Sequence, residues 1–272
     1  MKLNYYLSLA ALIPAAILFV RIYQLDHIEK EPRLLLGKLV LFGALAAVPA
    51  ALAQLLLTRA AGAALGRSTV WYLLLDNFVI VACSEELAKL LPVRLAAWDH
   101  PAFDYRFDAI VYSVSSALGF AAVENILYVL QSDLRTAVSR AILSVPGHFF
   151  FAVSMGLLLS RAKQAECCGQ LRRRRMLALL ALAVPTLLHG LWDFLLAAGS
   201  RWAVIAFYAF VAAFFITADV CLRRASRTAG CKIWMPGKDA FSELSNKKQA
   251  DCVAVCLFSV YNWDRKGQEA RI

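Results

Sequence analysis

Two adjacent glutamates and a lysine lie inside an apolar part of the chain, in the segment CSEELAKLLP (residues 83–92). On a helix, Lys89 is four positions after Glu85 and three after Glu86, so its ammonium group can reach either carboxylate. Two carboxylates side by side in a low-dielectric environment do not both ionise easily, so one tends to keep its proton. A proton acceptor beside a proton donor is what general acid–base catalysis on water requires.

Three other apolar stretches carry polar side chains at a similar depth. They contain His148, the pair Glu124–Asn125, and His189 with Asp193 four residues later. The last spacing lets a carboxylate hold and orient an imidazole on the same helix face. Measured from the flanking charged and tryptophan residues, His148, His189 and the Glu124–Asn125 pair fall within about one turn of the middle of their stretches, and Glu85 falls at the middle of its own. The coincidence in depth predicts one buried polar site built from four helices.

Each feature alone also has a structural explanation. A Glu–Lys pair can be a neutralised ion pair in a helix bundle, and a single buried histidine can be a hydrogen-bonded packing residue. Polar pairs such as Glu124–Asn125 can join helices through hydrogen bonds. Asp76 and Asn77 lie near the end of their stretch, where an interfacial role is favoured. The shared depth of four separate groups favours a functional site over packing alone.

The elements that position these residues are predicted to be membrane-spanning helices. The chain is 61% hydrophobic with a mean hydropathy of +0.61, above the usual composition of a soluble domain, and the apolar residues occur in long runs. Only helices suit continuous apolar runs of this length. The predicted fold class is all-α, a polytopic membrane bundle of about seven transmembrane helices. Their predicted ranges are 3–20, 34–57, 71–92, 107–130, 139–160, 176–197 and 202–221.

The basic residues indicate the orientation of the bundle. The net charge of +10 comes from clusters between the apolar runs, which favours a membrane protein over a nucleic-acid-binding protein. With the N-terminus outside, 22 Lys and Arg lie in inside loops and the tail, against 6 outside. We therefore predict the N-terminus out and the C-terminus in. Residues 1–221 form the predicted membrane domain, and residues 222–272 form a basic cytoplasmic tail to which no role is assigned.

The polar segments resemble the PrsW family of intramembrane proteases, which is related to the CAAX-prenyl and bacteriocin-processing proteases. The resemblance rests on EELAK (85–89), FAAVEN (120–125), PGHFFFAVSMG (146–156) and HGLWD (189–193). The first loop, YQLDHIEKEPRLL, is also similar to an acidic EP-rich loop of that family. The likeness covers about residues 1 to 220 in the same order.

The resemblance implies a bacterial inner-membrane endopeptidase. Its implied partners are the lipid bilayer and a single-span membrane protein substrate, such as an anti-sigma factor cut at an extracytoplasmic site; no nucleic acid is implied. The candidate catalytic residues are Glu85, Glu86, His189 and His148, and the supporting residues are Lys89, Glu124, Asn125 and Asp193.

The mechanistic hypothesis is peptide hydrolysis within the bilayer. One glutamate takes a proton from water, the other donates a proton to the leaving amine, and His189 or His148 stabilises the oxyanion. The sequence does not order Glu85 against Glu86. We favour a metal-free mechanism, because no HExxH motif is present. Zinc remains an alternative, and its candidate ligands are Glu85, Glu86, His148 and His189.

Two alternatives belong to other functional classes. Carboxylates in the middle of the membrane also form proton relays and ion sites, as in a transporter or channel. No repeated halves accompany them in this chain. A non-catalytic membrane scaffold is the second alternative, and it predicts that alanine at Glu85 or Glu86 leaves the cellular function intact.

Overall fold

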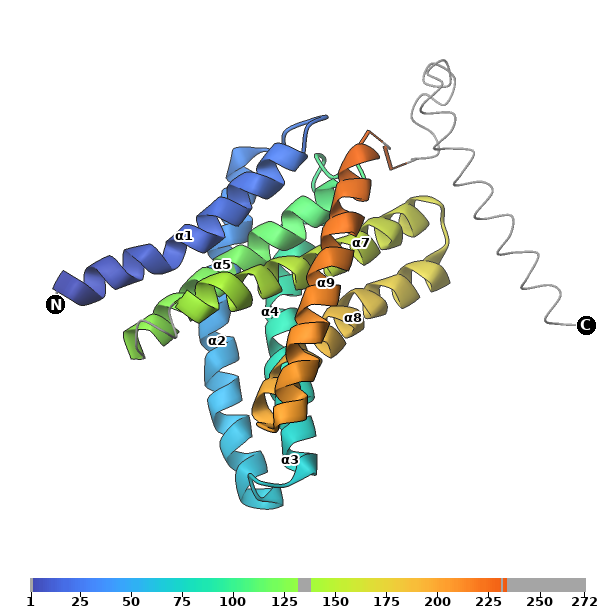
Figure 1. The fold of residues 1–272 in the computed structure, drawn as a ribbon. Helices are drawn as coiled ribbons and strands as arrows, with labels where there is room; N and C mark the ends of the chain where they lie inside the picture. The colour runs from blue at the N-terminus through green and yellow to red at the C-terminus, as the bar shows by residue number, and fades with distance from the viewer. Residues whose placement is uncertain (1, 132–137, 231, 234–272) are drawn as a thin grey trace, which may run out of the picture.

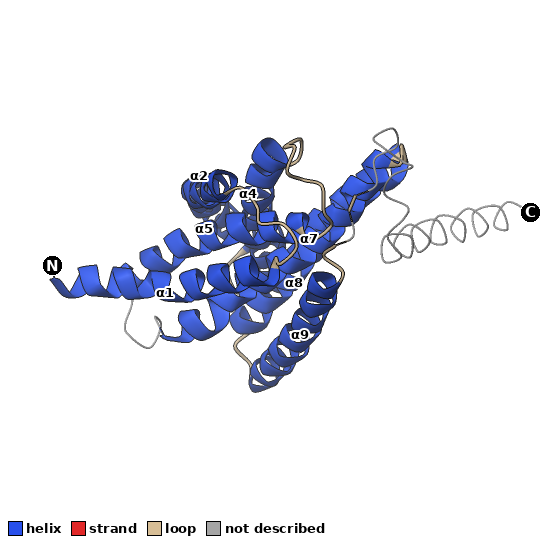
Figure 2. Ribbon diagram, turned by 90° about the horizontal axis from the view of Figure 1, so that it is seen from above, coloured by secondary structure: helices blue, strands red, loops and turns tan. Residues whose placement is uncertain are grey.

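The computed structural model describes residues 2–131, 138–230 and 232–233 of the 272-residue chain. These ranges contain helices joined by short loops and no strand, as Figure 2 shows. Most of the predicted tail, residues 234–272, lies outside them. The helical segments, with the π-helical ones labelled η, are α1 (Lys2–Leu25), α2 (Arg33–Leu65), α3 (Val70–Leu74), η1 (Leu75–Cys83), α4 (Ser84–Pro92), η2 (Val93–Ala97), α5 (Asp108–Gln131), η3 (Arg140–Ser144), α7 (Val145–Cys167), α8 (Leu171–Ala197) and α9 (Arg201–Arg227).

A glycine and a threonine form the turn between α2 and α3. Gly66 ends α2 with a φ of +74°, a left-handed conformation that favours glycine. Thr69 caps the next helix, its hydroxyl accepting a hydrogen bond from the main-chain N–H of Tyr72 at 3.2 Å. The chain reverses here, and α2 contacts the run from α3 through η2 beside it (Figure 1).

Helix α5 is the central element of the bundle. It contacts α1, α2, α4 and α7, and every residue from Phe107 to Ala121 is buried. Small residues permit this packing, because a Cβ at Gly119 would lie 2.0 Å from the main-chain oxygen of Val40 on α2. A Cβ at Gly43 would lie equally close to the main-chain oxygen of Ser116. The backbones of α2 and α5 therefore touch at this crossing.

Within the described part of the chain, five helices are long and apolar enough to cross a membrane, so the predicted all-α polytopic membrane bundle is confirmed. The first and third predicted spans correspond to α1 and to the run from α3 through η2. The count of seven and the orientation stay predictions. The five helices are Arg33–Leu65, Asp108–Leu130, Arg140–Cys167, Leu171–Ala197 and Arg201–Arg227.

The last described segment folds back onto the bundle. Helix α9 continues through Arg227, past the predicted domain boundary at 221. Ala229 and Ile233 are buried in the core, and the N–H of Ile233 donates to the main-chain oxygen of Asp104 at 2.7 Å. The described start of the predicted tail is thus packed against the loop between η2 and α5.

Candidate active site

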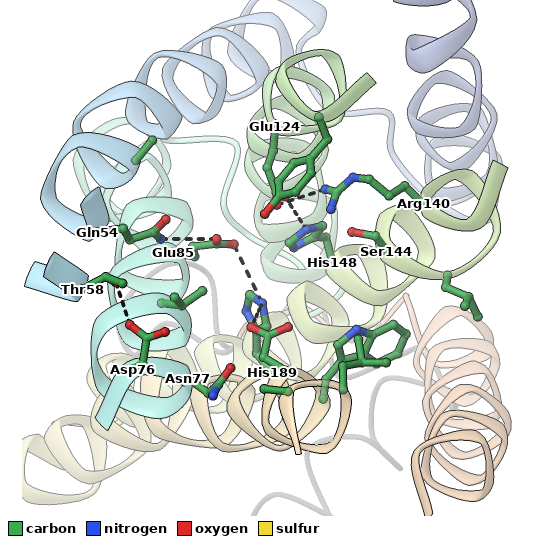
Figure 3. Close-up of a pocket in the computed structure, with 18 of the residues that line it drawn as sticks. Gln54, Thr58, Asp76, Asn77, Glu85, Glu124, Arg140, Ser144, His148 and His189 are labelled. Carbon is green, nitrogen blue, oxygen red and sulfur yellow. Dashed lines mark hydrogen bonds and ion pairs between the residues drawn. The ribbon is translucent and has the colours of Figure 1, made fainter. Parts of the chain in front are cut away.

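The predicted polar residues meet in one buried cluster. The short helix α4 supplies Glu85, Glu86 and Lys89, while α7 supplies His148 and α8 supplies His189. The side chains of Glu86 and Lys89 have no exposed surface, and the other three are nearly as buried. Residues more than one hundred positions apart in the sequence therefore lie in contact in the middle of the bundle (Figure 3).

Lys89 is the centre of the cluster. Its ammonium nitrogen lies 2.7 Å from Oε1 of Glu86, 3.4 Å from Oε2 of Glu85 and 2.9 Å from Nδ1 of His148. Its main-chain carbonyl accepts a hydrogen bond from Ser116 of α5 at 2.7 Å. Both ends of the residue are therefore held, and the sequence prediction that this lysine reaches both glutamates agrees with the geometry.

The partners of each histidine determine which nitrogen carries its proton. An ammonium group only donates hydrogen bonds, so Nδ1 of His148 accepts from Lys89, and the ring proton belongs on Nε2, which faces Oε2 of Glu124 at 2.7 Å. Nδ1 of His189 lies 2.9 Å from Oε1 of Glu86 and donates to it. Nε2 of His189 therefore faces the cavity.

Nε2 of His189 lies between two carboxylates. It is 3.3 Å from Oδ2 of Asp193 on the same helix and 3.9 Å from Oε2 of Glu85. The first contact has the four-residue spacing expected from the sequence. The second brings α8 to α4. Gly190 permits α8 to lie close to η1, just before α4, because a Cβ there would lie 2.4 Å from the ring of Phe78.

Glu85 also has a partner on α2 that sequence reasoning missed. The side-chain amide of Gln54 donates to Oε1 of Glu85 at 3.3 Å and to the hydroxyl of Ser84 at 3.0 Å. Gln54 is the one polar side chain between Lys38 and Thr58 of α2. A lone amide among apolar residues could have pointed to a contact with another helix, because a buried amide in a membrane span needs a hydrogen-bonding partner.

Arg140 is the second residue missed. It lies in η3 before His148 and forms an ion pair with Glu124 at 3.0 Å. Its Nε also donates to the side-chain oxygen of Asn125 at 3.2 Å. From the sequence, Arg140 is a charged residue that marks the end of a span. Its contact with α5 depends on how η3 packs against that helix.

A cavity of about 1140 Å³ opens onto this cluster. Glu85, Glu124, His148 and His189 line it (Figure 3), and so does Asp193. Its wall also includes residues at or near the helix ends that the charge distribution predicts to be outside, among them Arg59, Arg67 and Ala197. Asp76 and Asn77 belong to the same wall, with Thr58 donating to Asp76 at 2.6 Å, so these two residues line the cavity although the sequence favours an interfacial role for them.

A π-helix forms the cavity wall that leads to Glu85. The nine residues Leu75–Cys83 are wound as η1, immediately before α4. Such segments are rare and occur frequently at functional sites. Asp76, Asn77 and Val81 of η1 and Glu85 just after it line the cavity. Side chains from successive turns of this segment therefore face the cavity.

The described residues of the site carry more acids than permanent cations. The four acids are Glu85, Glu86, Glu124 and Asp193, and the two permanent cations are Lys89 and Arg140. Net charge is costly in a buried membrane site. Neutrality requires two more positive charges, which two protons on the histidines and acids, or one divalent cation, would supply.

Three side chains have the donors and the spacing for such a cation. Ligand atoms of Glu85, His148 and His189 lie within 4.8 Å of one another, and two imidazoles with one glutamate are a usual zinc set. The donor chemistry therefore fits zinc. The carboxylate of Glu86 accepts a hydrogen bond from the other ring nitrogen of His189, as carboxylates usually do at a metal-binding histidine. Glu86, the fourth candidate ligand, instead contacts Lys89 and the rear nitrogen of His189. Coordination through Nδ1 of His148 would require Lys89 to release that atom.

Comparisons with known proteins agree with this arrangement. A family profile described as PrsW family intramembrane metalloprotease matches residues 31–218. "Protease PrsW" of Geobacillus kaustophilus (strain HTA426) is 36% identical over 193 residues, which cover 71% of this chain and 80% of the relative. "Protease PrsW" of Clostridioides difficile (strain 630) is 35% identical over 215 residues, 78% of this chain and 87% of the relative.

A third relative extends the match over nearly its whole length. "Protease PrsW" of Shouchella clausii (strain KSM-K16) is 31% identical over 221 residues, which cover 81% of this chain and 97% of the relative. No solved structure matches the chain. The family profile and these relatives confirm the resemblance based on the four motifs. The chain therefore belongs to the PrsW family of intramembrane proteases and is a multi-pass membrane peptidase.

Proposed function

We propose that this peptidase cleaves membrane-anchored proteins with a water molecule activated by Glu85. The observation that carries this proposal is the different surroundings of the two adjacent glutamates. Glu85 lines the cavity, whereas Glu86 has no exposed surface and is bonded to Lys89 and His189 behind it. A general base must reach the water whose proton it takes, so the cavity-facing carboxylate is the better candidate.

In the proposed reaction, Glu85 accepts a proton from water as the water oxygen attacks the scissile carbonyl carbon. The tetrahedral intermediate carries its negative charge on the former carbonyl oxygen, where a protonated Nε2 of His189 can donate a hydrogen bond. The carbon–nitrogen bond then breaks, and Glu85 returns its proton to the amine nitrogen. One carboxylate thus serves as base and then as acid, and proton and charge balance over the cycle.

Glu86 and Lys89 act on this reaction through their neighbours. Glu86 holds the rear nitrogen of His189, so that the other nitrogen faces Glu85. Lys89 offsets the charge of Glu86 at 2.7 Å and lies slightly farther from Glu85. Zinc held by Glu85, His148 and His189 would supply Lewis-acid polarisation of the carbonyl and a more acidic water, and Glu85 would then be a ligand rather than the base. Metal content and chelation separate the two versions of the mechanism.

The cavity also suggests where the substrate binds. Its wall reaches from the glutamates to helix ends that the charge distribution predicts to be outside, and apolar side chains such as Leu55, Leu127 and Phe207 contribute to it. We infer a single-span protein of the bacterial inner membrane, such as an anti-sigma factor, cut on the extracytoplasmic side of the bilayer centre. The apolar wall can contact the membrane segment of this substrate. Because the wall reaches the extracytoplasmic helix ends, we expect the cut peptide bond to lie near that side.

The test is cleavage of a single-span anti-sigma-type substrate co-expressed with wild type, Glu85→Gln or Glu86→Gln. Glu29→Gln, in an exposed loop, is the matched control. We expect wild type and the control to cut, Glu85→Gln to lose cleavage, and Glu86→Gln to be strongly impaired, at equal amounts of membrane protein. Cleavage by a well-folded Glu85→Gln variant would contradict the assignment of the base.

The metal question needs its own measurement. Stoichiometric zinc in purified active protein, with activity lost on chelation and restored by zinc, would establish the metal version. Full activity after chelation would establish the metal-free one. Flux of protons or solutes into proteoliposomes that requires Glu85, without proteolysis, would instead favour a transporter.

A further inference from the structure

Arg140 contacts two neighbouring residues of the FAAVEN motif, Glu124 and Asn125. It lies in the π-helical segment η3, eight residues before His148. Its guanidinium contacts Glu124 and Asn125 on α5 and lies 3.9 Å from the ring centre of Tyr128 on the same helix. Figure 3 shows Arg140 directed toward Glu124 at the cavity wall.

The two oxygens of Glu124 have different partners. Oε1 lies 3.0 Å from Nη2 of Arg140, and Oε2 lies 2.7 Å from Nε2 of His148. The carboxylate thus connects the arginine to the histidine, and His148 in turn accepts from Lys89 at 2.9 Å. A continuous series of polar contacts runs from η3 to the glutamate pair of α4.

We propose that Arg140 is a positioning residue for the reaction, because it fixes Glu124 so that Glu124 holds His148 with Nδ1 directed at Lys89. This inference rests on the proposed proteolytic function. If Arg140 were absent, Glu124 would lose the ion pair that holds Oε1, while Oε2 would keep its contact with His148. His148 would then lose its fixed orientation, and Lys89 would lose one of its three side-chain acceptors.

The contacts of Arg140 require the shape of a guanidinium. One face of this planar group stacks on Tyr128 while two different nitrogens reach Glu124 and Asn125. A lysine ammonium can supply the charge at Glu124 but not a second directed bond together with stacking. The side chain of Arg140 is only 14% exposed, which differs from an arginine that extends into water at a membrane surface.

The experiment compares purified Arg140→Lys, Arg140→Gly and wild type in lipid–detergent bicelles, with varied concentrations of the same substrate in purified form. Loss of an outer-shell partner typically lowers activity 10–100-fold. We expect kcat to fall by about that factor in Arg140→Gly with KM nearly unchanged, and by less in Arg140→Lys. Guanidinium chloride should restore part of the kcat of Arg140→Gly, and sodium chloride at equal ionic strength should not. Arg161→Gly, at the exposed far end of α7, is the control and should cleave like wild type.

Several results would overturn the positioning role. A raised KM with normal kcat would indicate a substrate contact instead. Wild-type kinetics in Arg140→Gly would show that the arginine has no role in the reaction. Loss of folded protein in both variants would indicate a purely structural role. Absence of rescue by guanidinium in a folded Arg140→Gly would count against it as well. Failure of wild type to cleave any substrate would instead refute the proposed function, so the two failures are distinguishable.

Discussion

Replacing Lys89 by methionine tests the charge arrangement of the site most directly. The substitution keeps a flexible side chain of similar length but removes an ammonium that has no exposed surface. Glu86 and Glu85 then lose their cation at 2.7 and 3.4 Å, and His148 loses its donor. Removing one partner of a buried ion pair typically costs about 3–5 kcal/mol, because the other charge stays buried without compensation. We expect the free energy of unfolding to fall by that amount and cleavage to be lost.

A second substitution shows whether the loss comes from the unpaired charge. In the double variant Lys89→Met/Glu86→Gln, both members of the closest pair are neutral, and glutamine still offers an oxygen to His189. The double variant should therefore be at least about 2 kcal/mol more stable than Lys89→Met alone, while remaining inactive. Lys38→Met, at an exposed position of α2, should change stability by no more than about 0.5 kcal/mol.

The assay is reversible unfolding of the purified protein in lipid–detergent bicelles, with all four members of the double-mutant cycle measured under one condition. A cost below about 1 kcal/mol for Lys89→Met would refute the reasoning, because it would mean that the pair is not a compensated buried charge. Equal losses in the single and double variants would refute it too, since the loss would then come from packing.

Three further predictions concern other parts of the molecule. Gly119→Leu should abolish folding or lower the free energy of unfolding by at least about 3 kcal/mol, because even its Cβ would lie 2.0 Å from a main-chain oxygen of α2. Gly37→Ala, with open space around it, is the control and should leave the melting temperature nearly unchanged. Burial in the first loop, with nearby acidic groups adding to it, raises the pKa of Glu31 from 4.5 to about 7, so the folded state favours the protonated form. The contribution of Glu31 to stability should be fully present below about pH 4.5 and be lost as the pH rises through about 7, and Glu31→Gln should remove that component from a plot of melting temperature against pH. Gln54→Leu should lower kcat about 10-fold without loss of folded protein, because Glu85 loses the amide that orients it; unchanged kcat would show that this contact does not matter.

Local helix geometry explains why much of the site was predictable. Glu85, Glu86 and Lys89 share one short helix, and His189 and Asp193 share another, so their spacing alone implies contact. The apolar length of each span fixed the depth of its polar residues, because the hydrocarbon layer has a definite thickness. Helical spacing and span length therefore place the polar site residues at one depth of the bundle, whatever the packing of the helices.

The missed residues depend on contacts between distant segments. Gln54 meets Glu85 across 31 positions, and Arg140 meets Glu124 across the end of one helix and the start of another. Neither lies in a local pattern with its partner. The π-helical winding of Leu75–Cys83 was also not predicted, because its residues are as apolar as those of an ordinary α-helical span.

By itself, the sequence determined the class of the protein, an all-α membrane bundle, and the family-like motifs that carry its polar groups. Only the tertiary structure decided which of two adjacent glutamates faces the cavity. Neighbouring residues on a helix point in directions about 100° apart, and the rotation of α4 about its own axis selects between them. That rotation is set by its contacts with α2, α5 and α8, which no local pattern in the chain encodes.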